Sequence, residues 1–210
     1  GGAFFASFPL FYSTSFGGAY WVWILILITF VFQAVSYEFQ SKSGNILGKK
    51  VFRIFLMLNG ILAPLLIGTA VGTFFTGSAF SVDKAAVGDI ASPVISRWAN
   101  NWRGLEAVAN PFNVEFGVMV MLLAIVLGAL YTINNIDNEK LEKQLRSALS
   151  YSFCAFLVMF LIVMGRLLTM DGFAVDADGV VYMESYKYLH NLLEMPHTLV
   201  MIIMGALLLV

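Results

Sequence analysis

The segment 59–77 constrains this chain most, because it is long enough to cross a bilayer and contains no charged side chain. A helix in a soluble domain needs a polar face, and this segment offers none. Charged residues flank it on both sides, with Lys50 and Arg53 before it and Asp83 and Lys84 after it. We therefore interpret it as a membrane-spanning segment.

The composition of the whole chain agrees with this interpretation. Hydrophobic residues make up 60% of the chain, charged residues 12%, and the mean hydropathy is +0.84. Ordinary globular domains carry roughly 25% charged residues. A net charge of −1 gives no basic footprint for nucleic acid. The single cysteine, Cys154, lies in an apolar run, so we expect a buried, inert thiol that forms no intramolecular disulfide.

Hydropathy predicts six apolar segments, of which the first and the last are truncated. They are expected at 3–16, 19–37, 51–76, 110–134, 147–170 and from 196 onward. Because the chain begins without an initiator methionine and stops inside an apolar run, we interpret it as a fragment of a longer polytopic protein. The expected fold is an all-α transmembrane helical bundle with four complete spans, forming a single transmembrane domain over residues 1–210.

Local signals predict further details outside and inside the spans. Asn110 is a suitable N-cap, and Pro111 suits the first helical position. Asp178 and Gly179 predict a two-residue hairpin turn outside the membrane. The segment 92–105 predicts an amphipathic helix at the membrane surface, with its tryptophans at headgroup level.

The distribution of basic residues predicts the orientation in the membrane. Two short connections, 38–53 and 135–146, concentrate them, whereas the longer connections 78–109 and 171–195 carry fewer. Basic residues favour the cytoplasmic side, so we expect 38–53 and 135–146 to be cytoplasmic. The residues concerned are Lys42, Lys49, Lys50, Arg53, Lys140, Lys143 and Arg146.

Two ionisable residues at membrane depth are the candidates for buried polar function. Such residues are costly in a bilayer and are often functional. Glu115 lies near the start of the fourth span, where it is either a proton-route carboxylate or an acid near the outer interface. Arg166 lies near the end of the fifth span, where it either extends to the surface beside Asp171 or holds a cofactor or partner group.

Other polar residues have simpler interpretations. Gln33 and Asn59 are amides that a hydrogen bond across helices would satisfy. His190 and His197 would share one helical face only if the helix continued through Pro196, so interfacial histidines are favoured over haem ligation. The sequence shows no metal-binding cysteine motif and no catalytic triad, and no catalytic residue is predicted.

Glycines in the third span predict close packing against another helix. Gly68 and Gly72, followed by Gly77, offer a smooth face for helix–helix contact, either within the chain or with another subunit. The same glycine-rich span, which contains Pro64, leaves open a secondary transporter with a discontinuous helix at a midplane site. A purely structural assembly subunit is a third alternative.

Several motifs occur in an order that carries a family resemblance. The most specific comprises Pro64-Leu-Leu-Ile-Gly68, then Gly72, Gly77 and Phe80-Ser-Val-Asp83. The others are Gly1-Gly-Ala-Phe-Phe-Ala-Ser-Phe-Pro9 with Tyr12, Phe32-Gln-Ala-Val-Ser-Tyr-Glu-Phe-Gln-Ser-Lys42, Asn110-Pro-Phe112 with Gly117, and Asp171-Gly-Phe173. Over essentially its whole length, the chain resembles subunit II of the cytochrome bd-type quinol oxidases.

The resemblance has departures. Phe8 stands where the family more often has tryptophan, Gln33-Ala34 stands where many relatives have Arg-Pro, and Gln40 replaces an arginine. The first helix of the family and an acidic motif upstream of the Gly-Gly pair are missing here. That motif is the more suitable contributor to a proton route in the family.

The resemblance implies a role in a respiratory terminal oxidase of the bacterial inner membrane. Such oxidases transfer electrons from quinol to oxygen and take up protons from the cytoplasm. It implies that haem b and haem d belong to the partner subunit I, that this chain ligates no haem, and that it can hold a structural quinone. The expected partners are subunit I in a heterodimer, membrane lipid and quinone, with no nucleic acid.

Overall fold

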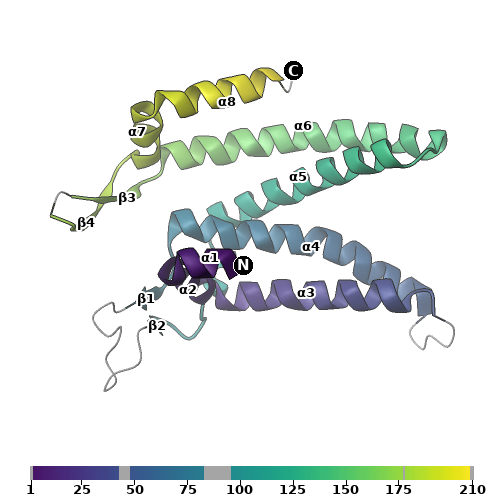
Figure 1. Cartoon of the computed structure of the whole chain (residues 1–210), viewed down its shortest axis with the longest axis horizontal. Coiled ribbons are helices and arrows are strands. Elements are labelled where there is room, and N and C mark those ends of the chain that lie inside the picture. Colours follow the sequence, from purple (N-terminus) through teal and green to yellow (C-terminus); the bar gives the residue numbers. More distant parts are fainter. Residues whose placement is uncertain (1, 43–47, 83–95, 177, 209–210) are drawn as a thin grey trace. The chain divides into compact units, whose positions relative to one another are not determined.

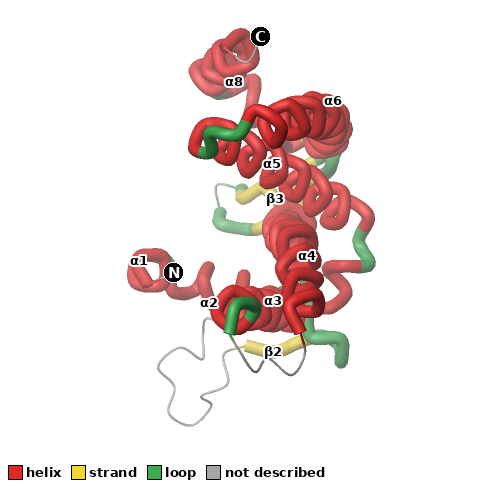
Figure 2. The backbone as a smooth tube through the Cα atoms, turned by 90° about the vertical axis from the view of Figure 1, so that its right-hand side faces the viewer, coloured by secondary structure: helices red, strands yellow, loops and turns green. Residues whose placement is uncertain are grey.

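The computed structural model describes residues 2–42, 48–82, 96–176 and 178–208, and helices dominate these residues (Figures 1 and 2). In chain order, the elements are α1 (Gly2–Ser7), α2 (Pro9–Gly18), α3 (Tyr20–Phe39), α4 (Gly48–Thr76), β1 (Phe80–Val82), β2 (Ser96–Trp98), a short 3-10 helix η1 (Leu105–Val108), α5 (Pro111–Asn135), α6 (Glu139–Thr169), β3 (Gly172–Val175), β4 (Val181–Glu184), α7 (Lys187–Glu194) and α8 (Pro196–Leu208). They form two compact units, Gly1–Met159 and Phe160–Val210, and α6 contributes to both.

The prediction of an all-α membrane bundle is confirmed. Helices α3, α4, α5 and α6 are each long and apolar enough to cross a membrane, and α8 is a shorter apolar helix. Large apolar side chains on these helices are exposed, for example Leu27 at 58% and Val31 at 61% in α3. A surface of this kind requires lipid or other apolar helices around it, so four helices of this chain are candidates to span a membrane.

Helix α4 is the central element of the first unit, because it packs against both α3 and α5 (Figures 1 and 2). A small core lies where α3, α4 and η1 meet. Its buried apolar residues are Ala19, Val22, Ile26, Ala70 and Ala107. All five belong to these helices or to the N-cap of α3, so the helix contacts themselves form the core.

Helix α4 is continuous through Pro64. The alternative of a discontinuous third span is therefore not supported, which removes the structural basis for the transporter interpretation. The helix ends at Thr76, and the φ of +74° at the next residue, Gly77, is the left-handed conformation that glycine adopts readily after a helix C-terminus. Its backbone N–H donates to the carbonyl of Thr73 at 2.8 Å. Gly77 thus terminates the helix and does not extend its packing face.

Three segment predictions need correction. The expected first segment, 3–16, is two helices, because Pro9 disfavours helical geometry at Phe8, which has φ −138° and ψ 64°. The expected connection 135–146 is mostly helix, since α6 begins at Glu139 and Glu142 pairs with Arg146 one turn later, at 2.7 Å. The connection 38–53 likewise contains the start of α4 from Gly48, and 43–47 lie outside the described residues.

The amphipathic helix predicted at 92–105 is also wrong where the structure describes it. Residues 92–95 lie outside the described residues, and β2 pairs antiparallel with β1, with Phe80 opposite Trp98. The Asn100 side chain accepts hydrogen bonds from the backbone N–H groups of Trp102 and Arg103, which favours a turn over a helix. Arg103 and Gly104 then adopt positive φ, which no α-helix contains.

The second unit contains a hairpin followed by two helices. Strands β3 and β4 pair antiparallel, which confirms the predicted hairpin. The N–H of Asp176 donates to the carbonyl of Val180 at 3.0 Å, so three residues separate the last bonded pair where two were expected. Gly179, the last of the three, adopts φ +78°. A left-handed glycine closing a three-residue loop is a common hairpin geometry. Gly172 of β3 lies against the start of α7, where a Cβ would lie 2.9 Å from Cβ of Lys187.

Candidate functional site at the two faces of helix α4

The contact between α4 and α5 depends on three glycines at the crossing. A Cβ on Gly68 would lie 2.7 Å from Cα of Gly117, and a Cβ on Gly117 would lie 2.5 Å from the carbonyl oxygen of Leu65. A Cβ on Gly72 would lie 2.9 Å from Cα of Asn113. The backbones approach so closely that no side chain fits between them. The predicted packing role of Gly68 and Gly72 is thereby confirmed.

A buried polar contact accompanies this crossing at the end of α4. Asn113 is 1% exposed, and its Oδ1 accepts a hydrogen bond from Oγ1 of Thr76 at 2.9 Å. Its Nδ2 donates to the carbonyl of Ala107 in η1 at 3.2 Å. One amide therefore joins α4, α5 and η1, and it is satisfied by protein groups. Sequence reasoning missed this contact, because Asn113 lies within the first turn after the Asn110 cap and was not distinguished from it.

Glu115 lies at the same end of α5, in the second turn of the helix. The cap before it is as predicted: Oδ1 of Asn110 accepts a hydrogen bond from the N–H of Phe112 at 3.0 Å, and Pro111 is the first helical residue. Glu115 is partly buried, and its Oε2 atom is inaccessible to solvent. This position suits a carboxylate held inside the bundle.

The opposite face of α4 leaves a groove against α3. The groove has a volume of about 380 Å³ and is almost entirely apolar. The rings of Phe32 and Phe55, one from each helix, approach at 5.3 Å between centroids. The lining residues are Leu25, Ile28, Thr29, Phe32, Phe55, Leu58, Asn59, Leu62 and Leu66. Because α3 and α4 are both candidate spans, the groove lies along the membrane-spanning part of the unit.

A pair of amides lies beside this groove. Nδ2 of Asn59 donates to Oε1 of Gln33 at 2.6 Å, which confirms the predicted hydrogen bond across helices. Asn59 is 5% exposed, and its Oδ1 has no hydrogen-bond partner among the described residues. A buried acceptor without a partner costs about 1–3 kcal/mol, so a ligand hydroxyl or N–H in this place would recover that energy. Gln33 and Asn59 are the polar groups best placed to orient an apolar ligand.

The second candidate, Arg166, belongs to the other compact unit. It lies in the last turn of α6, and its side chain is exposed. Glu115 and Arg166 therefore belong to different compact units. The exposed position agrees with a cation at the end of a span, where arginine extends its guanidinium toward water. Cys154, also on α6, is exposed, so the expectation of a buried thiol is wrong.

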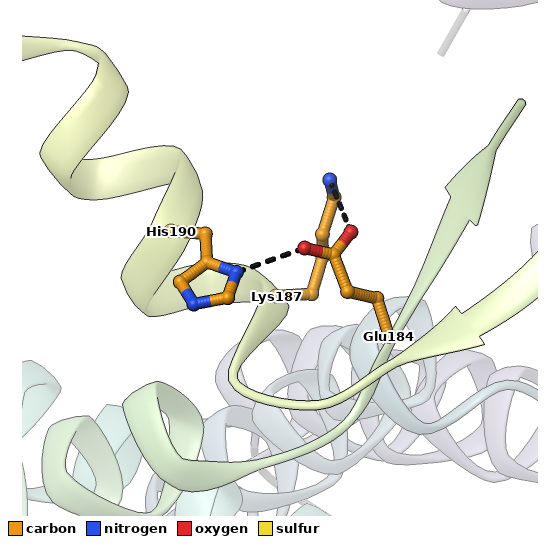
Figure 3. A network of polar contacts seen from close by, with 3 residues as sticks. All are labelled: Glu184, Lys187 and His190. Atoms are coloured by element: carbon orange, nitrogen blue, oxygen red, sulfur yellow. Dashed lines mark hydrogen bonds and ion pairs between the residues drawn. The ribbon is translucent and has the colours of Figure 1, made fainter. Parts of the chain in front are cut away.

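A network of charges connects the hairpin to α7 in the second unit (Figure 3). Glu184, at the end of β4, has one carboxylate oxygen 2.7 Å from Nζ of Lys187 and the other 2.8 Å from Nδ1 of His190. Hydrogen bonds from Lys187 and then His190 lower the pKa of Glu184 below its ordinary value. The bond to Glu184 raises the pKa of Lys187. All three residues lie outside the candidate spans, so this network stabilises an extramembrane connection.

The two histidines do not share one helix. His190 lies in α7 and contacts Glu184, whereas His197 lies in α8, and the helices are separated at Met195. The break agrees with the expectation that Pro196 interrupts a continuous helix. Among the described residues, no group of three or more His, Cys, Asp or Glu side chains could hold a metal ion.

Comparisons with known proteins identify a family. The whole chain, residues 1–210, matches the family model described as cytochrome bd terminal oxidase subunit II. It is 29% identical to the cytochrome bd-I ubiquinol oxidase subunit 2 of Escherichia coli K12, over 62% of this chain and 32% of the relative. It is 23% identical to a probable cytochrome oxidase subunit 2 of Haemophilus influenzae, over 93% of this chain and 52% of the relative.

A third relative, the cytochrome bd ubiquinol oxidase subunit 2 of Bacillus subtilis, is 23% identical over 74% of this chain and 43% of its own length. The chain therefore spans between about a third and about half the length of the curated relatives that it matches.

Proposed function

The chain belongs to the cytochrome bd terminal oxidase subunit II family, and from this premise we propose that it acts as the second subunit of a complex that oxidises quinol and reduces oxygen. The family match over all 210 residues carries this proposal. Four helices that can cross a membrane agree with a multi-pass membrane protein. Named relatives from three organisms are subunits of oxidases.

The proposed partner is the haem-bearing subunit I, which would hold haem b and haem d. In agreement with this assignment, the two histidines lie on different helices, His190 on α7 and His197 on α8, and do not form a ligand pair on one helical face. The reaction would then take place mainly in the partner, and residues 1–210 would serve it as a single transmembrane domain. The exposed apolar faces of α3, α5 and α6 offer surface for packing against it.

A location in the bacterial inner membrane, with the predicted basic segments in the cytoplasm, completes the proposal. Arg53 lies near the start of α4, whereas the strand pair containing Trp98 follows the other end of that helix. The concentration of basic residues in these segments supports a cytoplasmic location, and a tryptophan beyond the other end of α4 agrees with a membrane interface there. Residues 38–53 and 135–146 would face the cytoplasm.

Glu115 is proposed as a buried carboxylate on a proton or charge-compensation route, and Arg166 as an interfacial cation toward a partner or cofactor. The position of Glu115 supports the first role, since it lies inside the bundle at the positive end of α5. Replacing Glu115 with Gln keeps the shape of the side chain and removes its charge. Slower proton uptake at unchanged haem content would support the role, whereas unchanged proton uptake would contradict it.

The groove between α3 and α4 is the proposed place for a structural quinone. Its apolar walls fit an isoprenoid tail, and the acceptor Oδ1 of Asn59 fits a donor hydroxyl of the reduced head group. Within the protein, Gln33 would fix the Asn59 amide through their hydrogen bond, so that Oδ1 keeps its orientation. The bound molecule would stabilise the contact between the two helices.

An optical spectrum of the full-length protein, purified from its native membrane in mild detergent, tests the proposed function. We expect reduced-minus-oxidised bands of haem b and haem d in stoichiometric yield, together with quinol-dependent oxygen uptake. A stable colourless preparation without a haem-bearing partner would contradict the proposal.

A further inference from the structure

A second apolar groove lies at the N-terminal end of α3, where the segment that follows β2 packs against this helix. Its volume is about 270 Å³, and it is lined by Trp21, Leu25, Asn101, Trp102 and Leu105. Trp21 and Leu25 come from the first two turns of α3, and the other three come from the segment that leads into η1. The walls are aromatic and aliphatic, with one amide among them.

The position of this groove along α3 places it at the membrane boundary. Helix α3 begins at Tyr20 and is a candidate span, so its first turns mark the level at which the chain leaves the hydrocarbon region. Trp102 is 65% exposed and Trp21 is 42% exposed. Tryptophans with large exposed area are typical of the headgroup level, where one part of the ring contacts hydrocarbon and the other contacts water.

An arginine, Arg103, lies within the segment 101–105 that forms one wall of the groove. The guanidinium of Arg103, the residue after Trp102, lies 5.5 Å from the ring centroid of Trp98. Arg97 on β2 is also exposed, and neither arginine has an ion-pair partner among the described residues. Among the described residues, the acid nearest in the chain is Glu106, which accepts hydrogen bonds from the N–H of Gly104 at 3.0 Å and Nδ2 of Asn100 at 3.2 Å. Its carboxylate is thus engaged within the turn.

The backbone holds Arg103 in a conformation that arginine rarely adopts. Its φ is +48°, and a left-handed conformation is unfavourable for a residue with a long side chain. Surrounding contacts impose it: Oδ1 of Asn100 bonds the N–H of Arg103 at 3.3 Å, and the carbonyl of Arg103 accepts from the N–H of Trp21 at 3.4 Å. Glycine or asparagine would fit this position better for the fold alone, so an arginine here indicates a use for its charge.

We propose that this groove binds one anionic phospholipid of the surrounding leaflet, with an acyl chain between Trp21 and Trp102 and the phosphate beside Arg103. Charge complementarity favours an anionic lipid over a neutral one, since an arginine attracts an anionic headgroup at the membrane surface. The apolar walls match the acyl chain, and Asn101 offers an amide near the glycerol region. This groove shares one lining residue, Leu25, with the groove between α3 and α4, and the lipid proposal does not depend on the quinone proposal.

Native mass spectrometry of the purified full-length complex tests the site. Delipidated complex is titrated with phosphatidylglycerol or with phosphatidylcholine, and the lipid retained per complex is counted. Arg103→Gly and Arg103→Asn remove the cation and also suit a positive φ, so neither should impair folding. We expect each to lower phosphatidylglycerol affinity about fivefold and to leave phosphatidylcholine binding unchanged, from the contribution of one arginine at a membrane surface.

Two further variants complete the design. Trp102→Ala should weaken binding of both lipids, because it removes a wall of the groove. Lys140→Gln, which removes an exposed cation at the start of α6, should change neither. The proposal is overturned if the unmodified complex retains both lipids equally, if the Arg103 variants keep the preference for phosphatidylglycerol, or if Trp102→Ala has no effect. An unchanged unfolding midpoint in the Arg103 variants shows that the loss concerns lipid binding.

Discussion

The two faces of helix α4 differ in how closely a neighbouring helix approaches. On the face toward α5, glycines bring the backbones together, and a Cβ on Gly117 would collide with α4. On the face toward α3, phenylalanines and leucines keep the helices apart and leave a groove of about 380 Å³. The comparison shows that residue size along one helix separates a contact that fixes the fold from a contact that can admit a ligand.

The buried amides on the two faces of α4 also differ, in how completely protein groups satisfy their hydrogen bonds. On the closed face of α4, which is the face toward α5, both the oxygen and the nitrogen of the Asn113 amide have protein partners. On the open face of α4, which is the face toward α3, the nitrogen of the Asn59 amide bonds Gln33, and its Oδ1 has no partner among the described residues. Substitutions on the closed face should therefore change stability, and substitutions on the open face should change what binds.

The largest effect is expected from Gly117→Leu. The new side chain would have to occupy space held by the backbone of Leu65 and by Thr69, so overpacking should cost about 3 kcal/mol or more. We expect a large loss of assembled complex and a lower unfolding midpoint. The control is Gly128→Leu in the same helix, where a Cβ meets nothing within 4 Å. Equal stability of the two variants would show that the close contact is not essential.

Asn113→Ala should have the next largest effect. It removes the acceptor of Thr76 and leaves the carbonyl of Ala107 without its donor, in a buried position, which should cost about 1–3 kcal/mol. The unfolding midpoint of the complex measures this loss. Asn135→Ala is the matched control, since that amide is exposed and bonds only to the carbonyl of Tyr131 in its own helix. A midpoint that falls equally in both variants would contradict the assignment.

Asn59→Leu should change ligand content more than stability. It breaks the hydrogen bond to Gln33 but also removes a buried acceptor without a partner, and the two effects offset, so we expect stability to change by less than about 1 kcal/mol while quinone retained by the purified complex falls severalfold. Leu62→Trp should displace quinone by filling the groove with Asn59 intact. Met57→Trp adds the same ring at an exposed position that does not line the groove. Quinone content that is the same in all three variants would argue against this site.

The smallest effect concerns the charge network of the second unit. Because the folded state lowers the pKa of Glu184, its contribution is present above the ordinary pKa of 4.5 and is lost as the pH falls below that value. Lys187, whose pKa is raised, loses its contribution only as the pH rises above 10.5. The hydrogen-exchange protection factors of β4 and α7, which correct for the intrinsic pH dependence of exchange, should therefore be higher at neutral pH than in acid. Glu184→Gln should exchange faster at neutral pH, and slow exchange in that variant would contradict the role of the carboxylate.

Much of the fold was predictable because hydropathy and local capping act over short distances. The spans now seen as α3, α4 and α5 lie within a few residues of their predicted bounds, and the Asn110 cap is as expected. The break before Pro9 follows from a local rule as well, and it was missed because the apolar pattern continues across it.

The features that sequence reasoning missed depend on tertiary contacts or on competing local bonds. The helical pattern around Trp98 and Trp102 was real, but the Asn100 side chain and the β1–β2 pairing determine the structure there. Of the candidate site, a hydrogen bond across helices was predicted for Gln33 and for Asn59, whereas their pairing with each other and the groove beside them were not. The groove is formed by side chains of two helices. Which of these side chains face each other depends on how the helices pack, and the sequence alone does not show this.

A cryo-EM map of the full-length complex, purified in mild detergent, would test the contrast between the two faces of α4 most directly. We predict elongated non-protein density in the groove beside Asn59 and none between α4 and α5, where Gly68 and Gly117 are in contact. A groove closed by side chains of this subunit or its partner, or a ligand between α4 and α5, would contradict the account.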